Sequence, residues 1–313
     1  LFVTTKAIVA TGSYGPKGFG VEIGVPQGAE EADGIDGLTR VVRDQIGHGA
    51  DWIKIYADYR WGPRGEARPT FTNEEWAAIV RTATSSGRPV VAHASTVEGM
   101  TRAIMAGVED IEHGDMATPE VFALMKQHNV AFCPTLSATE STTRYRGWKK
   151  GVDADPAGIV QKKAMFKAAL ASGVTICNGS DVGVFAHGAN ALELELMVDY
   201  GMSPVAALQA ATSVNARIMH RETEFGRVAP GLLRANSATV GNSLILASVS
   251  TFFAMILGTI AAYSLVRFKT GGENLAVWII SQRMVPPIAV VFPIFLLYVF
   301  LGWVDTYIGI ILL

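Results

Sequence analysis

Four side chains that can take part in metal binding stand within or just after short apolar segments of the chain. They are Lys54, His93, His113 and Asp181. Imidazole and carboxylate groups bind borderline cations such as zinc, and three protein ligands with one free position are typical of a catalytic site. Lys54 departs from this pattern because an ammonium group repels a dication. A desolvated lysine has a lowered pKa, however, and its neutral amine can add carbon dioxide to form an anionic carbamate.

These residues also have simpler interpretations. A histidine at a strand end can be a hydrogen-bonded core residue, and Lys54 can pair with Asp58. We favour a metal site because the four positions occur together at predicted strand ends. Two further residues are candidate substrate contacts. Tyr56 lies on the same strand face as Lys54, where it can instead fill the interior, and His187 lies in the loop after Asp181.

The other histidines have structural interpretations. His48 and His128 precede Gly49 and Asn129 at predicted helix ends, where a cationic side chain favours the helix dipole. His220 is predicted to lie on the surface.

A repeating unit of helix, Gly or Asn, short apolar strand and polar residue positions the candidate site. The predicted strands are residues 52–56, 89–93, 110–113, 130–134 and 174–178. The residues before them tolerate the left-handed conformation that closes a helix, and they are Gly49, Gly87, Gly107, Asn129 and Gly173. Helices are predicted to begin after Thr72, with Glu75 completing a capping box, and after Thr118 and Ser203, each followed by Pro.

Strands that alternate with helices predict an α/β fold with parallel pairing and right-handed crossovers. An open doubly wound sheet and a closed (β/α)8 barrel both agree with this periodicity. Chemically active residues at the carboxyl ends of several different strands favour a TIM-type barrel. No Gly-x-Gly-x-x-Gly loop follows a predicted strand, so a dinucleotide-binding fold has little support.

Charge and cysteine content narrow the class of protein. The net charge of -2 comes without a basic patch, which argues against a nucleic-acid partner. Cys133 and Cys177 lie in apolar segments, and we interpret them as buried free thiols in a reducing compartment. Leu1 is not an initiator methionine and no secretory signal pattern follows it, so we expect a fragment.

The last quarter of the chain has a different composition. Residues 244–266 and 285–304 are uncharged apolar runs, each long enough to cross a bilayer. We therefore predict a soluble part at 1–234, a junction at 235–242, and transmembrane helices at 243–313, with two spans and the start of a third. Arg267 and Lys269 between the spans predict a cytoplasmic loop, which would place residues 1–240 outside the cytoplasm. A reduced enzyme without a signal sequence does not suit that location, which favours a junction of two incomplete genes.

Five short motifs occur in order along residues 1–233. They are Trp-Ile-Lys-Ile-Tyr at 52–56, Ala-His-Ala at 92–94, Ile-Glu-His-Gly at 111–114, Gly-Ser-Asp at 179–181 and Thr-Ser-Val-Asn-Ala at 212–216. Together they resemble the amidohydrolase superfamily, nearest to its imidazolonepropionase-like and Xaa-Pro dipeptidase-like branch. The resemblance implies a (β/α)8 barrel and a cytoplasmic enzyme that hydrolyses an amide-type C–N bond of a dipeptide or cyclic amide by a metal-activated hydroxide.

The same resemblance implies residue roles. Lys54 would be a carbamate bridging two divalent metals, with zinc the expected ion; His93 and His113 would bind one metal. Asp181 would bind the other and act as general base. The family's first-strand His-x-His pair occurs nowhere in this sequence. We therefore expect about six of eight barrel strands, one or two bound ions, and impaired activity.

The final segment carries a second resemblance. Its motifs include Asn242-Ser243, the small-residue stretch at 257–263 and Met-Val-Pro-Pro at 284–287, which resemble the permease subunit of maltose-type carbohydrate ABC transporters. This implies lipid contacts along 244–304. An ATPase partner is not expected, because the Glu-Ala-Ala coupling loop is missing. The alternatives to a hydrolase are a transporter fragment and a non-functional chimera of two truncated genes.

Overall fold

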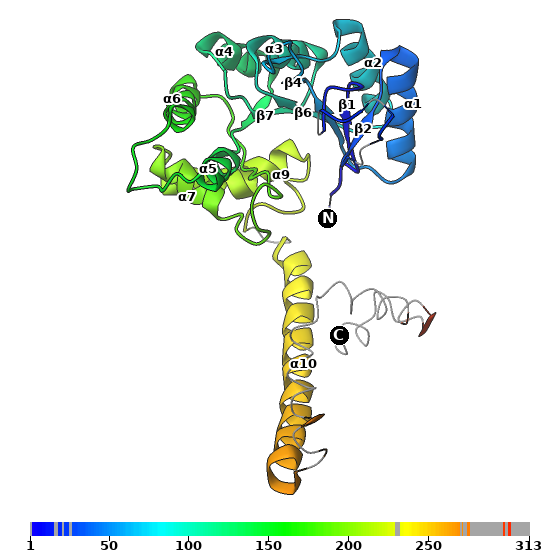
Figure 1. Ribbon diagram of the computed structural model, residues 1–313, viewed down its shortest axis with the longest axis vertical. Coiled ribbons are helices and arrows are strands. Elements are labelled where there is room, and N and C mark those ends of the chain that lie inside the picture. Colours follow the sequence, from blue (N-terminus) through cyan, green and yellow to red (C-terminus); the bar gives the residue numbers. More distant parts are fainter. Residues whose placement is uncertain are drawn as a thin grey trace. The chain divides into compact units, whose positions relative to one another are not determined.

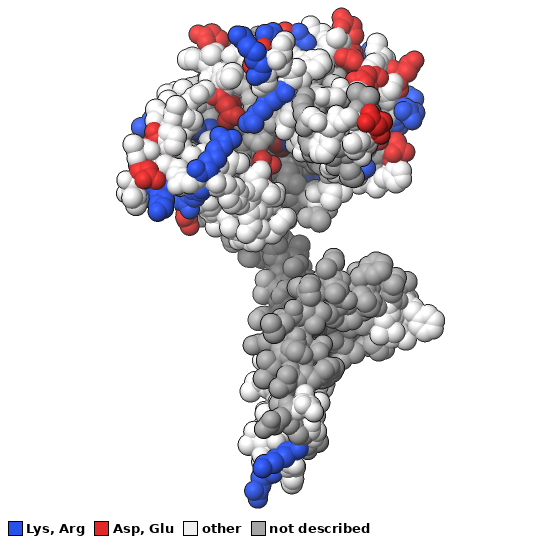
Figure 2. All heavy atoms as spheres, viewed as in Figure 1, with Lys and Arg blue, Asp and Glu red and all other residues white. Residues whose placement is uncertain are grey.

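The computed structural model describes residues 2–15, 18–20, 22–24, 27–228 and 232–269, together with 271, 274–275, 297 and 300–301. The chain divides into two compact units, Leu1–Arg227 and Val228–Leu313, each of which is considered by itself. The first unit contains the strands and the helices that cover them (Figure 1). On the face of this unit seen in Figure 2, acidic and basic side chains are interspersed.

Six short strands of the first unit form one parallel sheet in the order β2-β1-β3-β6-β7-β8. They are β1 (Ala7–Val9), β2 (Ala29–Glu31), β3 (Ile53–Tyr56), β6 (Val90–Ala94), β7 (Asp110–His113) and β8 (Ala131–Cys133). The parallel α/β architecture agrees with the alternation of strands and helices in the sequence. Strand β2 was not predicted, because its Ala-Glu-Glu sequence lacks an apolar run and its pairing with β1 is a tertiary contact.

Helices follow most of the strands. They are α1 (Gly34–Gly47), α2 (Asn73–Thr84), α3 (Val97–Ala106), α4 (Pro119–His128), α5 (Leu136–Tyr145), α6 (Ala157–Ser172), α7 (Leu192–Asp199), α8 (Pro204–Gln209), the π-helix Ala210–Val214 and α9 (Asn215–Ile218). Helices α1 to α4 succeed one another around the outside of the sheet (Figure 1). Fully buried side chains such as Ile53 and Ile55 of β3 and Trp76 and Ile79 of α2 form the core between the two layers.

The predicted helix boundaries are confirmed. In the capping box of α2, the Thr72 N–H donates to Glu75 Oε2 (2.8 Å) and the Glu75 N–H donates to Thr72 Oγ1 (3.3 Å). The side chains of Thr118 and Ser203 cap α4 and α8 in the same way as Thr72, and Pro stands at the first position of both helices. All five residues predicted to close helices have positive φ: Gly49, Gly87, Gly107, Asn129 and Gly173.

The predicted strand at 174–178 is wrong in extent. The segment forms a single parallel bridge, between Ile176 and Phe132. In this bridge the Phe132 N–H donates to the Thr175 carbonyl, and the Cys177 N–H donates to the Phe132 carbonyl. Within the described part of the chain, this segment pairs with β8 on one side and has no strand on its other side. Its apolar sequence therefore does not lead to a full strand.

The prediction of free thiols is also wrong. Cys133 and Cys177 form a disulfide, with Cα atoms 4.8 Å apart. Their separation of 44 residues gave no sign of contact; the bridge between Phe132 and Ile176 sets their two segments side by side.

A small antiparallel hairpin follows β3. It consists of β4 (Asp58–Arg60) and β5 (Ala67–Pro69) and was not predicted, because its residues lack a run of alternating apolar positions. The hairpin carries Asp58, Tyr59 and Arg60 to the carboxyl end of the parallel sheet, where they line a cavity.

In the second unit, helix α10 (Leu232–Phe268) contains the whole of the first apolar run, 244–266. Residues Ala247–Phe268 are long and apolar enough to cross a membrane, by length and composition only, and none of this window is buried. The predicted junction at 235–242 lies within α10. The second apolar run, 285–304, lies outside the described residues except at three positions.

Candidate active site

A cavity of about 470 Å³ opens at the carboxyl ends of β3, β6 and β7. Polar and aromatic side chains dominate its wall: Tyr14, Tyr56, Asp58, Tyr59, Arg60, His93, Ser95, His113, Asp115, Thr139, Thr142 and Asp181. Of the six residues predicted for the site, Tyr56, His93, His113 and Asp181 line this cavity. Lys54 and the exposed His187 are not part of its wall.

The two histidines lie side by side. The ring centroids of His93 and His113 are 4.5 Å apart, with the planes inclined at 66°. Burial lowers the pKa of His93 to about 3, and the Lys54 ammonium adds to the effect. Burial, followed by the neighbouring His93, lowers the pKa of His113 well below its ordinary value. Both imidazoles are therefore neutral at pH 7 and can offer a lone pair to a cation.

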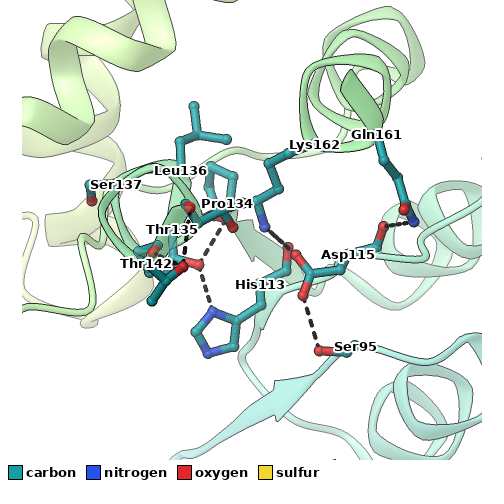
Figure 3. A network of polar contacts seen from close by, with 12 residues as sticks. Ser95, His113, Asp115, Pro134, Thr135, Leu136, Ser137, Thr142, Gln161 and Lys162 are labelled. Carbon is teal, nitrogen blue, oxygen red and sulfur yellow. Dashed lines mark hydrogen bonds and ion pairs between the residues drawn. The ribbon is translucent and has the colours of Figure 1, made fainter. Parts of the chain in front are cut away.

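Thr135 fixes the tautomer of His113. Its Oγ1 lies 2.6 Å from His113 Nδ1 and donates to the Pro134 carbonyl at 2.8 Å (Figure 3). Because a hydroxyl has a single hydrogen, Thr135 must accept a hydrogen bond from His113 Nδ1–H. That tautomer leaves the lone pair on Nε2, as in metal-binding histidines oriented by an outer partner. Thr135 carries no recognisable motif and is marked only by its place after an apolar segment.

Asp58 anchors the neighbourhood of His93. Its carboxylate is fully buried and accepts hydrogen bonds from the Ser95 N–H and from the Thr96 N–H and hydroxyl, at 2.7 to 3.0 Å. His93 Nε2 lies 3.9 Å from Asp58 Oδ1, and the Tyr56 ring stacks on the imidazole with centroids 4.3 Å apart. Sequence reasoning considered Asp58 only as a partner for Lys54.

That pairing of Lys54 with Asp58 is wrong. The Lys54 ammonium forms an ion pair with Glu112 of β7, the strand that carries His113. Burial lowers the pKa of Lys54 to about 8, although Asp110 and Asp181 act in the opposite direction. Burial thus favours the neutral amine, the form that can add carbon dioxide, whereas the ion pair with Glu112 favours the charged ammonium. In the sequence Glu112 stands out only as a member of the Ile-Glu-His-Gly motif, because its pairing with Lys54 depends on the alignment of the strands.

A buried lysine supports the backbone of His113. Lys162 of α6 is 2% exposed and donates to the His113 carbonyl (2.7 Å) and to Asp115 Oδ1 (2.6 Å). Asp115 also accepts from the Ser95 hydroxyl at 3.2 Å (Figure 3). Burial raises the pKa of Asp115, but Lys162, together with Ser95 and His93, more than offsets this effect and holds that pKa below its usual range. The sequence did not reveal Lys162, one of several lysines in its helix.

Three residues beside the cavity have left-handed backbone conformations. The φ angles are 72° at His113, 47° at Thr135 and 54° at Asp181. Each such conformation costs about 1–3 kcal/mol in a residue other than glycine and persists only where its surroundings enforce it. For His113 and Thr135, the hydrogen bonds shown in Figure 3 supply part of that support. Partial burial raises the pKa of Asp181, while Lys54 and Lys162 oppose the effect.

The paired neutral imidazoles of His93 and His113 are two groups of the cavity wall that can bind a divalent cation. In the described part of the chain, the His, Cys, Asp and Glu side chains that bring three ligand atoms within 4.8 Å of one another are Asp110, Cys133 and Cys177. The carboxylate of Asp181 therefore does not form, with the ligand nitrogens of His93 and His113, a group whose atoms all lie within 4.8 Å of one another. Its position in the cavity wall suits a proton acceptor better than a shared ligand.

The sequence pattern of the amidohydrolase family matches residues 20–233. The chain belongs to the amidohydrolase family. This confirms the resemblance drawn from the five motifs, and members of this family generally bind divalent metals. The comparisons give no support to a permease segment at 242–313.

Individual relatives agree with the family assignment. Ochratoxinase of Aspergillus niger is 34% identical over 191 residues, 58% of this chain and 39% of the relative. An uncharacterized protein of Mycobacterium bovis is 28% identical over the same share of this chain and 51% of its own length. The chain thus spans about two-fifths to one-half of these relatives.

Solved structures show the same fold. A Xaa-Pro dipeptidase with methionine bound in its active site superposes with a TM-score of 0.64 and 32% identity, covering 74% of this chain and 59% of the dipeptidase. The structure of A. niger ochratoxinase gives a TM-score of 0.61 at 28% identity, covering 73% of this chain and 57% of the other.

Proposed function

We propose that this chain is a divalent-cation-dependent hydrolase of an amide-type C–N bond in a dipeptide or cyclic amide. The proposal is carried by the neutral pair His93 and His113, which shares a cavity with Asp181 in a chain of the amidohydrolase family. Similarity to a Xaa-Pro dipeptidase supports an amide substrate. The six-stranded sheet would be part of the wall of a (β/α)8 barrel.

The proposed cation is zinc, held by His93, His113 and a carbamate formed on Lys54. A divalent cation there supplies Lewis acidity, which lowers the pKa of water and polarises the substrate carbonyl. Asp181 accepts the proton of the attacking water and returns it to the departing nitrogen. These residues suffice for one cation. A second would need ligands beyond Asp181 and the carbamate, so we expect at most one tightly held ion in this site and slow turnover.

The cavity wall suggests how a substrate is oriented. Arg60 lines the cavity, and its planar guanidinium can bind a carboxylate through two parallel hydrogen bonds. Tyr14 and Tyr59, whose ring centroids are 5.1 Å apart, form an aromatic wall beside it. We therefore expect substrates with a free C-terminal carboxylate. Substrate contact by the exposed His187 stays a prediction, which His187→Ala tests through KM.

The experiment is hydrolysis of a series of Xaa-Pro dipeptides and N-acyl amino acids by the full chain, with zinc and bicarbonate added. His113→Asn should abolish both cation retention and turnover. Asp181→Asn should retain the cation but lower kcat by about 10²–10⁴-fold. His128→Asn, in the last turn of α4, serves as the control. Activity that survives removal of the cation, or that His113→Asn leaves intact, would contradict the proposal.

The apolar segment calls for a proposal of its own. We propose that lipid is the partner of α10, because Ala247–Phe268 has the length and composition of a membrane span and exposes large apolar side chains such as Phe252, Leu257 and Ile260.

A further inference from the structure

A second cluster of ligand-type side chains lies away from the wall of the cavity described above. Asp110 of β7, Cys133 of β8 and Cys177 hold one ligand atom each within 4.8 Å of the other two. All three residues are at least nine-tenths buried, with exposures of 7%, 9% and 1%. Two sulfurs and a carboxylate oxygen at this spacing match the donor set of a thiophilic divalent cation.

The carboxylate of this cluster is incompletely satisfied. Asp110 Oδ1 is buried and has no hydrogen-bond partner among the described residues. A buried acceptor without a partner destabilises the folded chain, so such atoms usually have a ligand or a functional reason. The same three residues line a cavity of about 260 Å³, together with Glu112 and Asn178. A cation and a water molecule can therefore be accommodated beside Asp110.

We propose that Cys133, Cys177 and Asp110 form a redox-controlled cation site, closed as a disulfide and able to bind one zinc ion when reduced. A small-molecule thiol supplies the two electrons: two of its thiols become a disulfide while the Cys133–Cys177 bond becomes two thiols. Binding of Zn²⁺ then releases both thiol protons, leaving two thiolates and the Asp110 carboxylate as ligands. Water from the cavity occupies the fourth position.

The test uses the full chain carrying His93→Asn and His113→Asn, so that the proposed hydrolase site cannot retain the probe. After reduction with a small thiol and removal of the reductant, Co²⁺ is added as a spectroscopic substitute for Zn²⁺. We expect one equivalent of cobalt with a sulfur-to-cobalt charge-transfer band. The oxidised protein should show no such band, and Zn²⁺ should displace the cobalt.

Variants assign the ligands. Cys133→Ser and Cys177→Ser should each eliminate most of the charge-transfer band. Asp110→Asn, which keeps the shape of the side chain, should weaken cobalt binding by about tenfold or more while leaving both thiols titratable. Circular dichroism of each variant checks folding.

Three results would overturn the proposal. The first is that the reduced, folded protein has two titratable thiols but shows no charge-transfer band with cobalt. The second is that Asp110→Asn leaves the band unchanged. The third is that the disulfide cannot be reduced without unfolding the protein. Because the background lacks both histidines, these outcomes are independent of whether the hydrolase proposal holds.

Discussion

Thr135 and Asp58 stand next to the two imidazoles of the cavity without offering a ligand atom to the proposed zinc ion. Thr135 accepts from His113 Nδ1–H, and buried Asp58 lies 3.9 Å from His93 Nε2. Thr135 is the kind of outer partner that holds a metal-binding histidine in one tautomer and orientation. The stacked ring of Tyr56 further restricts His93.

The hydroxyl of Thr135 can be removed with little change of shape. Thr135→Val should lower zinc affinity by about 10–100-fold, because His113 Nδ1–H loses its acceptor and the tautomer is no longer fixed. Zinc titration with a competing chelator measures the effect. Thr135→Ser keeps the hydroxyl and should bind almost as tightly as the original chain. Equal affinities in the valine and serine variants would show that the hydrogen bond does not orient His113.

The buried histidines should make the metal-free protein sensitive to acid. In the folded state the pKa of His93 is about 3, whereas an unfolded histidine titrates near 6.5. Between these values the unfolded chain binds more protons, so the free energy of unfolding falls as pH decreases through this window. One histidine contributes at most about 1.4 kcal/mol per pH unit.

His93→Gln should remove that part of the pH dependence. Urea unfolding of metal-free protein at several pH values between about 7 and 4 provides the comparison. The original chain should lose stability more steeply than the variant as pH falls. Parallel profiles would mean that His93 is not held neutral by burial.

Helices bring remote residues to the ends of the strands. The first turn of α3 packs against Asp58, whose carboxylate accepts a hydrogen bond from Thr96, the N-cap residue of α3. A Cβ added at Gly99 would lie 2.3 Å from Asp58 Oδ2. Helix α6 reaches the end of β7 through Lys162. Both contacts fix the elements that carry the two histidines.

The α3 contact predicts an unusual cost for a glycine-to-alanine change in a helix. Gly99→Ala should destabilise the protein by about 1–3 kcal/mol, because the carboxylate of Asp58 must move from its four hydrogen bonds. Gly158→Ala, in the first turn of α6 with open space around it, should be neutral or slightly stabilising. Thermal unfolding compares the two, and an equal response would contradict the packing argument.

The α6 contact predicts a difference between adjacent lysines. Lys162→Met should destabilise the protein by about 1–3 kcal/mol, because the His113 carbonyl and Asp115 lose their donor. Lys163→Met removes a half-exposed pair with Asp155 and should cost less than about 1 kcal/mol. Denaturant unfolding measures both changes. A similar loss from both variants would mean that the buried network adds no stability of its own.

At the scale of the whole molecule, the two units have different surfaces. The first carries interspersed charges over the face seen in Figure 2, whereas exposed residues of α10 are mainly apolar up to Arg267. An exposed apolar helix of this length must be covered by lipid, by protein or by self-association.

Membrane association provides the corresponding prediction. The full chain should co-sediment with phospholipid vesicles and resist extraction by salt, because Ala247–Phe268 buries its side chains in hydrocarbon. Leu257→Lys together with Ile260→Lys should shift the chain to the soluble or aggregated fraction, since each charge near the helix centre costs about 2.5–3.5 kcal/mol. Val160→Lys, an exposed position of α6, is the matched control. Unchanged vesicle binding by the double variant would exclude α10 as the span.

Features that depend only on neighbouring residues could be predicted from the amino-acid sequence. Helix caps at Thr72, Thr118 and Ser203 and the left-handed residues at helix ends follow from local backbone chemistry. The alternation of strands and helices predicted the α/β class, and the motifs around His93 and His113 indicated the amidohydrolase family.

Tertiary structure decided what depends on contacts between distant segments. The pairing of Lys54 with Glu112, the disulfide between Cys133 and Cys177, and the support of His113 by Thr135 and Lys162 join residues 22 to 58 positions apart. No local pattern encodes such partners, because strand alignment and helix packing bring them together. The protonation states of the site also depend on the folded chain, because burial lowers the pKa values of His93, His113 and Lys54 only there.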